Sequence, residues 1–137
     1  MDFAGIVACT ARQVADFVKT AKESGLLDNT GVVIVGDHLA MPNPLDETLK
    51  QAPERNIFNL FVGEGTPAKV VEEVLPFDMF PTVLQFIGVE VQGGRLALGY
   101  AAFADSPVRR SAQDAAALHD GVLNPSSIYL DLWRPLP

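Results

Sequence analysis

The stretch Val32-Val33-Ile34-Val35-Gly36-Asp37-His38 decides how this sequence of 137 residues folds. Its first four residues are β-branched and continuously apolar, which is typical of a strand with both faces covered, as in the centre of a parallel sheet. Gly36 ends the apolar run, and two polar side chains follow it. We therefore expect an α/β fold with a mostly parallel central sheet flanked by helices, and Asp37 and His38 at the carboxyl end of a strand.

Helical patterns flank this strand on both sides. From Phe3 to Ala21 the apolar residues recur at the spacing of one helix face, and Ser24-Gly25 stops the pattern. After the strand, residues 45–51 favour a short helix and residues 56–62 (NIFNLFV) favour a second strand. The strand therefore lies between two helical segments, as an α/β fold requires.

The second half of the chain continues the alternation of predicted helices and strands. Asp78 is placed to cap a helix that ends near Ile87, with Gly88 closing it. Residues 111–118 favour another short helix, and residues 127–130 resemble a strand. We find no internal repeat and no low-complexity tract, so we expect residues 1–137 to form a single domain.

Composition excludes several classes of protein. Hydrophobic residues make up 48% of the chain and charged residues 20%, which is too apolar for a disordered tail. Ten basic residues against 17 acidic ones leave a net charge of −7, and no basic run interrupts the acidic spread, so we expect no nucleic-acid partner. The apolar runs are too short for a membrane span, so we expect this chain to be soluble.

Asp37 and His38 carry the strongest chemical signal. Ligands collect where strands of an α/β sheet end, and a carboxylate beside an imidazole can bind a metal ion. Asn43 and Arg55 are candidates for holding an anionic phosphate or sulfate group. Each residue also has a plain structural interpretation: Asp37 accepting turn amides, His38 simply exposed, Asn43 making a turn and Arg55 solvated.

Four motifs, in this order, resemble the C-terminal part of the alkaline phosphatase and sulfatase superfamily: LLDNTGVVIVGDHLAMPN (26–43), RNIFNLFVG (55–63), DMFPTVLQFIG (78–88) and GGRLALG (93–99). The Asp-His-Leu-Ala-Met-x-Asn motif is most similar to membrane phosphoglycerol transferases, relatives of lipoteichoic acid synthase. The resemblance covers about residues 6–103 and leaves residues 104–137 as an unassigned tail. It implies the C-terminal portion of a sandwich like that of alkaline phosphatase.

The resemblance also implies a chemistry. Asp37 and His38 would bind a divalent metal, manganese first, with zinc or magnesium as alternatives. A Thr or Ser nucleophile would accept glycerol phosphate from a lipid donor and pass it to a glucan, on the periplasmic side of the membrane for the parent protein. The family's nucleophile belongs to the N-terminal half of its domain, so we assign no catalytic residue and expect this chain to be inactive alone. Its partner would be that missing half or another copy of the chain.

Two other functions stay open. A non-catalytic binding module could complete its sheet by self-association, because part of such a fold exposes strand edges and apolar faces. A sulfatase or phosphatase hydrolase is the second alternative. The run Leu39-Ala40-Met41 favours the transferase, because hydrolases of the superfamily more often have Gly after the His.

Overall fold

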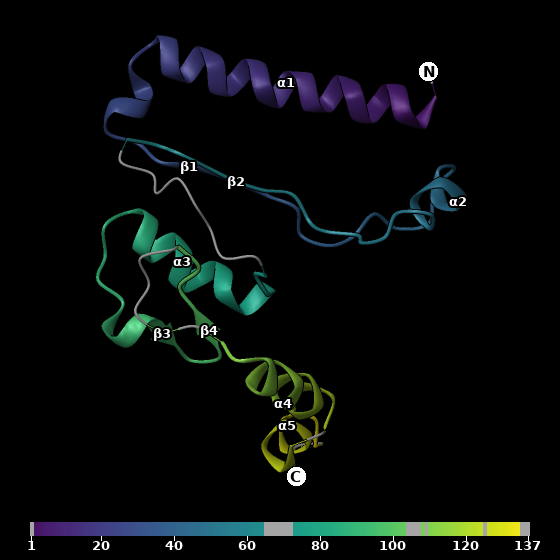
Figure 1. Ribbon diagram of the computed structural model, residues 1–137, viewed down its shortest axis with the longest axis vertical. Helices are drawn as coiled ribbons and strands as arrows, with labels where there is room; N and C mark the ends of the chain where they lie inside the picture. Colours follow the sequence, from purple (N-terminus) through teal and green to yellow (C-terminus); the bar gives the residue numbers. More distant parts are fainter. Residues whose placement is uncertain (1, 65–72, 104–107, 109, 125, 135–137) are drawn as a thin grey trace. The chain divides into compact units, whose positions relative to one another are not determined.

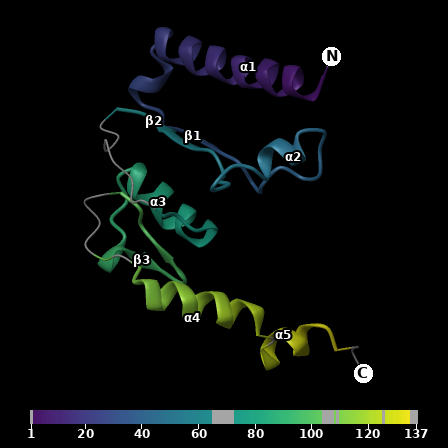
Figure 2. The same ribbon diagram turned by 45° about the vertical axis from the view of Figure 1, so that its right-hand side comes forward.

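The computed structural model describes residues 2–64, 73–103, 108, 110–124 and 126–134. The chain divides into two compact units, Met1–Ala68 and Lys69–Pro137, and each contains helices and a two-stranded sheet (Figures 1 and 2). The mixed α/β class is as predicted. The assignment of residues 1–137 to one domain stays a prediction, and the two units are described separately.

Helix α1 (Phe3–Glu23) opens the first unit and confirms the helix predicted from residue spacing. The carboxylate of Asp2 accepts a hydrogen bond from the Gly5 amide at 2.7 Å, which satisfies one of the first-turn amides that lack a helical partner. Gly25 then takes a left-handed conformation with φ of 76°, and a single turn of 3-10 helix (Leu26–Asp28) follows. This turn brings the chain into the first strand.

Strands β1 (Val32–Val35) and β2 (Asn59–Val62) pair antiparallel, with Val32 opposite Val62. The prediction of a mostly parallel sheet is therefore wrong for the described residues, whose four strands form two antiparallel pairs. The physical reason lies in the connection. The chain leaves β1, passes through the short helix α2 (Asp46–Leu49) and returns alongside the strand it left (Figure 1), whereas parallel pairing needs a crossover back to the starting end.

In the second unit, a 3-10 turn (Pro76–Asp78) continues into helix α3 (Met79–Phe86), close to the predicted helix. Strands β3 (Arg95–Leu96) and β4 (Gly99–Tyr100) form the second antiparallel pair. Asp78 occupies the predicted N-cap position of α3, but its side chain makes no capping hydrogen bond to that helix. One carboxylate oxygen accepts instead from the Leu75 amide at 2.8 Å, which caps the preceding turn.

The other oxygen of Asp78 links distant parts of the unit. It accepts from the Tyr100 amide at 2.8 Å and from a guanidinium nitrogen of Arg110 at 2.5 Å. Thr82 has its hydroxyl between the Asp78 carbonyl, to which it donates at 2.5 Å, and the Ala102 amide, from which it accepts at 3.0 Å. We call Asp78, Thr82 and Arg110 the Asp78 clamp. Because Asp78 is 4% exposed, its charge needs the Leu75 and Tyr100 amides and the Arg110 guanidinium that bind the carboxylate.

Helix α4 (Ala112–Leu123) begins shortly after Arg110 in the sequence and extends beyond the predicted residues 111–118. Ser111 caps it by accepting from the Asp114 amide at 3.0 Å, and the Ser111 hydroxyl donates to the Asp114 carboxylate at 2.7 Å. This hydrogen bond lowers the pKa of Asp114 below its usual value. The capping box explains why a helix of only weak amphipathicity begins at this residue.

Helix α5 (Ser127–Leu132) replaces the strand predicted over residues 127–130, which was wrong. Ser126 begins the helix by accepting from the Tyr129 amide at 3.0 Å. The apolar run Ile128-Tyr129-Leu130 is too short to distinguish strand from helix, and the cap decides between them.

The buried apolar core is small in both units. Among the described residues it includes Ala21 and Leu27 in the first unit and Ala101, Ala102 and Phe103 in the second. Many large apolar side chains are exposed, among them Phe17 at 59% and Trp133 at 72%. Exposed apolar faces are what the sequence predicted for part of a larger fold.

Gly99 gives a test of the packing around the Asp78 clamp. A Cβ added there would lie 1.9 Å from the Phe77 carbonyl oxygen, whereas one added at Gly121 in α4 would meet no atom within 4 Å. We expect Gly99→Ala to lower the free energy of unfolding by about 1–3 kcal/mol through overpacking. Gly121→Ala should leave it unchanged or raise it by up to about 1 kcal/mol. Urea denaturation followed by circular dichroism measures both, and equal effects would contradict this packing.

Candidate metal-binding site

Asp37 and His38 lie on the loop that leaves β1, directly after the last hydrogen bond of the β1–β2 pair. That bond runs from the Gly36 amide to the Phe58 carbonyl at 2.9 Å. Both side chains are open to solvent, with exposed fractions of 87% for Asp37 and 55% for His38. The sequence therefore located the pair correctly, at the end of a strand.

The two side chains converge on each other. One carboxylate oxygen of Asp37 accepts from the His38 amide at 2.9 Å, and the other, Oδ2, lies 3.4 Å from His38 Nε2. Two ligand atoms about 2.1 Å from one cation, at an angle of about 90–110°, are about 3.0–3.4 Å apart. The pair thus fits two neighbouring positions around a single divalent ion.

A backbone carbonyl fixes which nitrogen of His38 is available. Nδ1 lies 2.7 Å from the Leu39 carbonyl oxygen. A carbonyl accepts hydrogen bonds and cannot donate them, so Nδ1 carries the proton in this contact. The lone pair of the neutral ring is then on Nε2, the atom that faces Asp37, and this is the arrangement in which imidazoles bind metals.

Asn43 lies at the end of the same loop and organises a turn. Its amide nitrogen donates to the Met41 carbonyl at 2.8 Å and to the Asp46 carboxylate at 3.1 Å, while its amide oxygen accepts from Leu45 at 2.9 Å. These bonds agree with the turn-making interpretation of an Asn between two prolines. Contact between Asn43 and a substrate stays a prediction.

Arg55 reaches the loop from the segment before β2. Its Nη2 donates to the Ala40 carbonyl at 3.2 Å, a contact that spans 15 residues of sequence. A guanidinium has five N–H donors, so this bond leaves room for an anion. The structure therefore brings Arg55 to the loop that carries Asp37 and His38, and its contact with substrate stays a prediction.

The ligand set is limited to the pair. Within residues 2–64, 73–103, 108, 110–124 and 126–134, no group of three or more His, Cys, Asp or Glu side chains could hold a metal. The sequence also gave no sign of two backbone groups that contact the site residues: the Leu39 carbonyl, which binds the His38 ring, and the Ala40 carbonyl, which binds Arg55. No side-chain pattern could have revealed them, because every residue type supplies a carbonyl.

Comparisons with known proteins agree with the motifs. The sulfatase family profile matches residues 2–89. Phosphoglycerol transferase I of Xanthomonas axonopodis pv. citri is 33% identical over 118 residues, which are 84% of this chain and 16% of that protein. The same-named protein of Xanthomonas campestris pv. campestris (strain B100) is 35% identical over 65 residues, 47% of this chain and 9% of that protein.

The chain spans about a sixth or less of the length of these curated relatives. No solved structure matches it. In the part of the chain that the structure describes, no helix is both long enough and apolar enough to cross a membrane.

The Leu39 contact makes a spectroscopic prediction for the metal-free chain. At about pH 8.5, where an ordinary imidazole is neutral, the His38 ring should be predominantly the Nδ1–H tautomer. Long-range ¹H–¹⁵N correlation spectra distinguish the tautomers, and His119, exposed on α4, is the internal comparison. A predominant Nε2–H form of His38 would contradict the contact.

Proposed function

Because the chain belongs to the sulfatase family, we propose that it supplies the C-terminal part of a metal-dependent phosphoglycerol transferase. Members of this family generally depend on metal ions. The observation that carries the proposal is the convergence of Asp37 Oδ2 and His38 Nε2 at 3.4 Å on the loop after β1. The phosphoglycerol transferases among its relatives favour transfer over the sulfatase or phosphatase alternative.

In this proposal Asp37 and His38 hold a divalent ion, manganese first, with zinc or magnesium as alternatives. Carboxylates suit manganese and magnesium, and imidazole suits zinc, so a mixed pair is compatible with all three. When bound, the metal would polarise a phosphoryl oxygen of the substrate. Asn43 and Arg55 would bind the anionic part of a glycerol phosphate lipid, and a glucan on the periplasmic side would accept the group.

Two ligands do not complete a catalytic metal site, which normally has at least three protein ligands. We propose that the nucleophile and the remaining ligands come from the rest of a sulfatase domain, and that this chain alone transfers nothing. The open loop is compatible with this proposal, because Asp37 and His38 are accessible to a second set of ligands.

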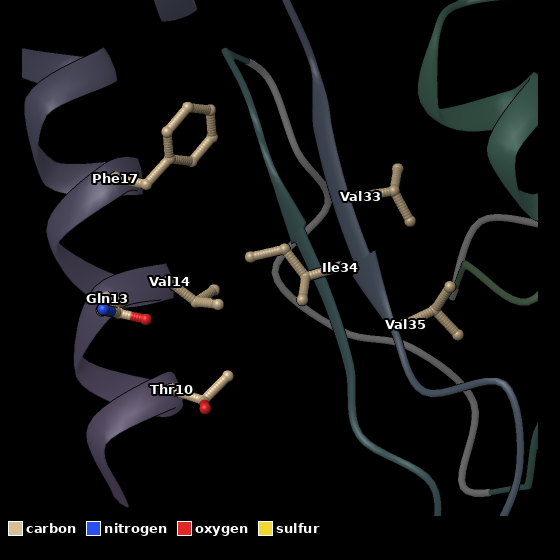
Figure 3. Close-up of a pocket in the computed structure, with 7 residues that line it drawn as sticks. All are labelled: Thr10, Gln13, Val14, Phe17, Val33, Ile34 and Val35. Atoms are coloured by element: carbon tan, nitrogen blue, oxygen red, sulfur yellow. The ribbon is translucent and has the colours of Figure 1, made fainter. Parts of the chain in front are cut away.

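An apolar groove in the first unit supports the need for a partner. Helix α1 and strand β1 frame an open groove of about 480 Å³, and Phe17, Val14 and Ile34 point into it (Figure 3). Its full lining is Thr10, Gln13, Val14, Phe17, Val33, Ile34 and Val35. We propose that the rest of a sulfatase domain covers the groove. A second copy of the chain is the alternative, and it corresponds to a non-catalytic, self-associating module.

Metal titration tests the proposed site directly. We expect the chain to bind Mn²⁺ or Zn²⁺ weakly, and Asp37→Asn or His38→Gln to weaken binding at least tenfold by removing a ligand. Asp16→Asn on α1 and His119→Gln on α4 make the same chemical changes elsewhere and should have no effect. Isothermal titration calorimetry measures all five proteins. Absence of binding to the unaltered chain, or equal binding by all variants, would contradict the site.

Light scattering tests the alternative partner. If a second copy covers the groove, the molar mass of the chain should rise toward a dimer with concentration, and Phe17→Lys should return it to a monomer. Ala15→Lys adds the same charge to the opposite face of α1 and should leave the association intact. A monomer at every concentration would reject the self-associating module and leave the rest of a sulfatase domain as the proposed partner.

A further inference from the structure

We infer that Arg55 is a positioning residue for the Asp37–His38 site, acting through the backbone of the loop that carries it. The inference rests on the proposed function and adds to Arg55 a role distinct from contact with substrate. Its basis is a chain of two contacts: Arg55 binds the Ala40 carbonyl, and the preceding carbonyl, that of Leu39, binds the His38 ring.

The two carbonyls belong to consecutive residues, so the direction of one constrains the other. The peptide planes on either side of Ala40 turn about that residue's two backbone dihedrals. A hydrogen bond that fixes the Ala40 carbonyl restricts those dihedrals and with them the direction of the Leu39 carbonyl. The Leu39 carbonyl in turn holds the proton of His38 on Nδ1 and leaves Nε2 available.

The position of the Arg55–Ala40 hydrogen bond explains why the loop needs such a restraint. The β1–β2 ladder ends at the Gly36 amide, and the Asn43 turn begins the approach to α2. Between them residues 37–41 are exposed and have no regular secondary structure. Arg55 ties the middle of this segment to the chain that leads into β2. The rigid, planar donor geometry of a guanidinium suits this task better than the flexible ammonium of a lysine.

Electrostatics makes the inference sharply testable, because charge and positioning predict opposite results. A positive guanidinium beside the loop repels a divalent cation, so a residue acting by charge alone would weaken metal binding, and its removal would strengthen it. A residue that orients the ligand strengthens binding, and its removal weakens it. The sign of the change therefore separates the two roles.

The experiment compares Mn²⁺ affinity and the His38 tautomer in the full chain and three variants. Loss of a group that orients a metal ligand typically weakens affinity about 10- to 100-fold, and for this exposed contact we expect about tenfold for Arg55→Met. Arg55→Lys should recover part of the loss. Arg12→Met, which removes the same charge from α1, should change affinity less than twofold. In Arg55→Met the His38 spectrum should show both tautomers, with His119 unchanged.

The outcomes separate this inference from the proposed function. Unchanged or tighter binding by Arg55→Met, with the Nδ1–H tautomer retained, overturns the positioning role while leaving the metal site intact. If the unaltered chain binds neither Mn²⁺ nor Zn²⁺, the proposed site fails. The metal-free tautomer measurement then decides the positioning role by itself: mixed tautomers in Arg55→Met support it, and an unchanged spectrum overturns it.

Discussion

The point at which the β1–β2 ladder ends is the constraint on which the candidate site depends. Pairing continues from Val32 to the Gly36 amide, which donates to Phe58, and the next two residues leave the sheet. Within a strand, successive side chains point to opposite faces, so two neighbouring residues cannot bind the same metal ion. Because Asp37 and His38 lie just beyond the ladder, their side chains converge to 3.4 Å. Pairing two residues further along β1 would separate the two groups.

A different constraint, the buried charge of Asp78, organises the second unit. Its carboxylate joins the turn before α3 to Tyr100 and Arg110, which lie 22 and 32 residues away in the sequence. Arg110 lies beyond residues 2–89, which the sulfatase profile matches. At least the first part of the region expected to be an unassigned tail thus supplies the counter-charge for a family motif. The Asp-x-x-Pro-Thr sequence here has a structural role, because Asp78 and Thr82 are buried and both bind backbone groups, and Asp78 also binds Arg110.

Features with a local cause could be predicted from the sequence. The period of apolar residues specified α1, and the strand-to-loop change at Gly36 located the Asp37–His38 pair. Features set by distant partners could not be predicted. The apolar run of β1 suggested parallel pairing, but the direction of β2 relative to β1 depends on the connection through α2. The partners of Asp78 are remote in sequence, and the Leu39 and Ala40 carbonyls have no side-chain signature.

The polar pair and the apolar groove belong to the same unit, and the proposed function connects them. A partner that covered the groove beside β1 and added ligands to the loop after β1 would use one strand for both purposes. Metal binding and partner binding would then be coupled, because each stabilises the arrangement that the other requires. Thermodynamic linkage makes such coupling reciprocal: the partner raises metal affinity by the same factor by which the metal raises partner affinity. On this view the weak metal affinity expected of the isolated chain follows from the open groove as much as from the missing ligands.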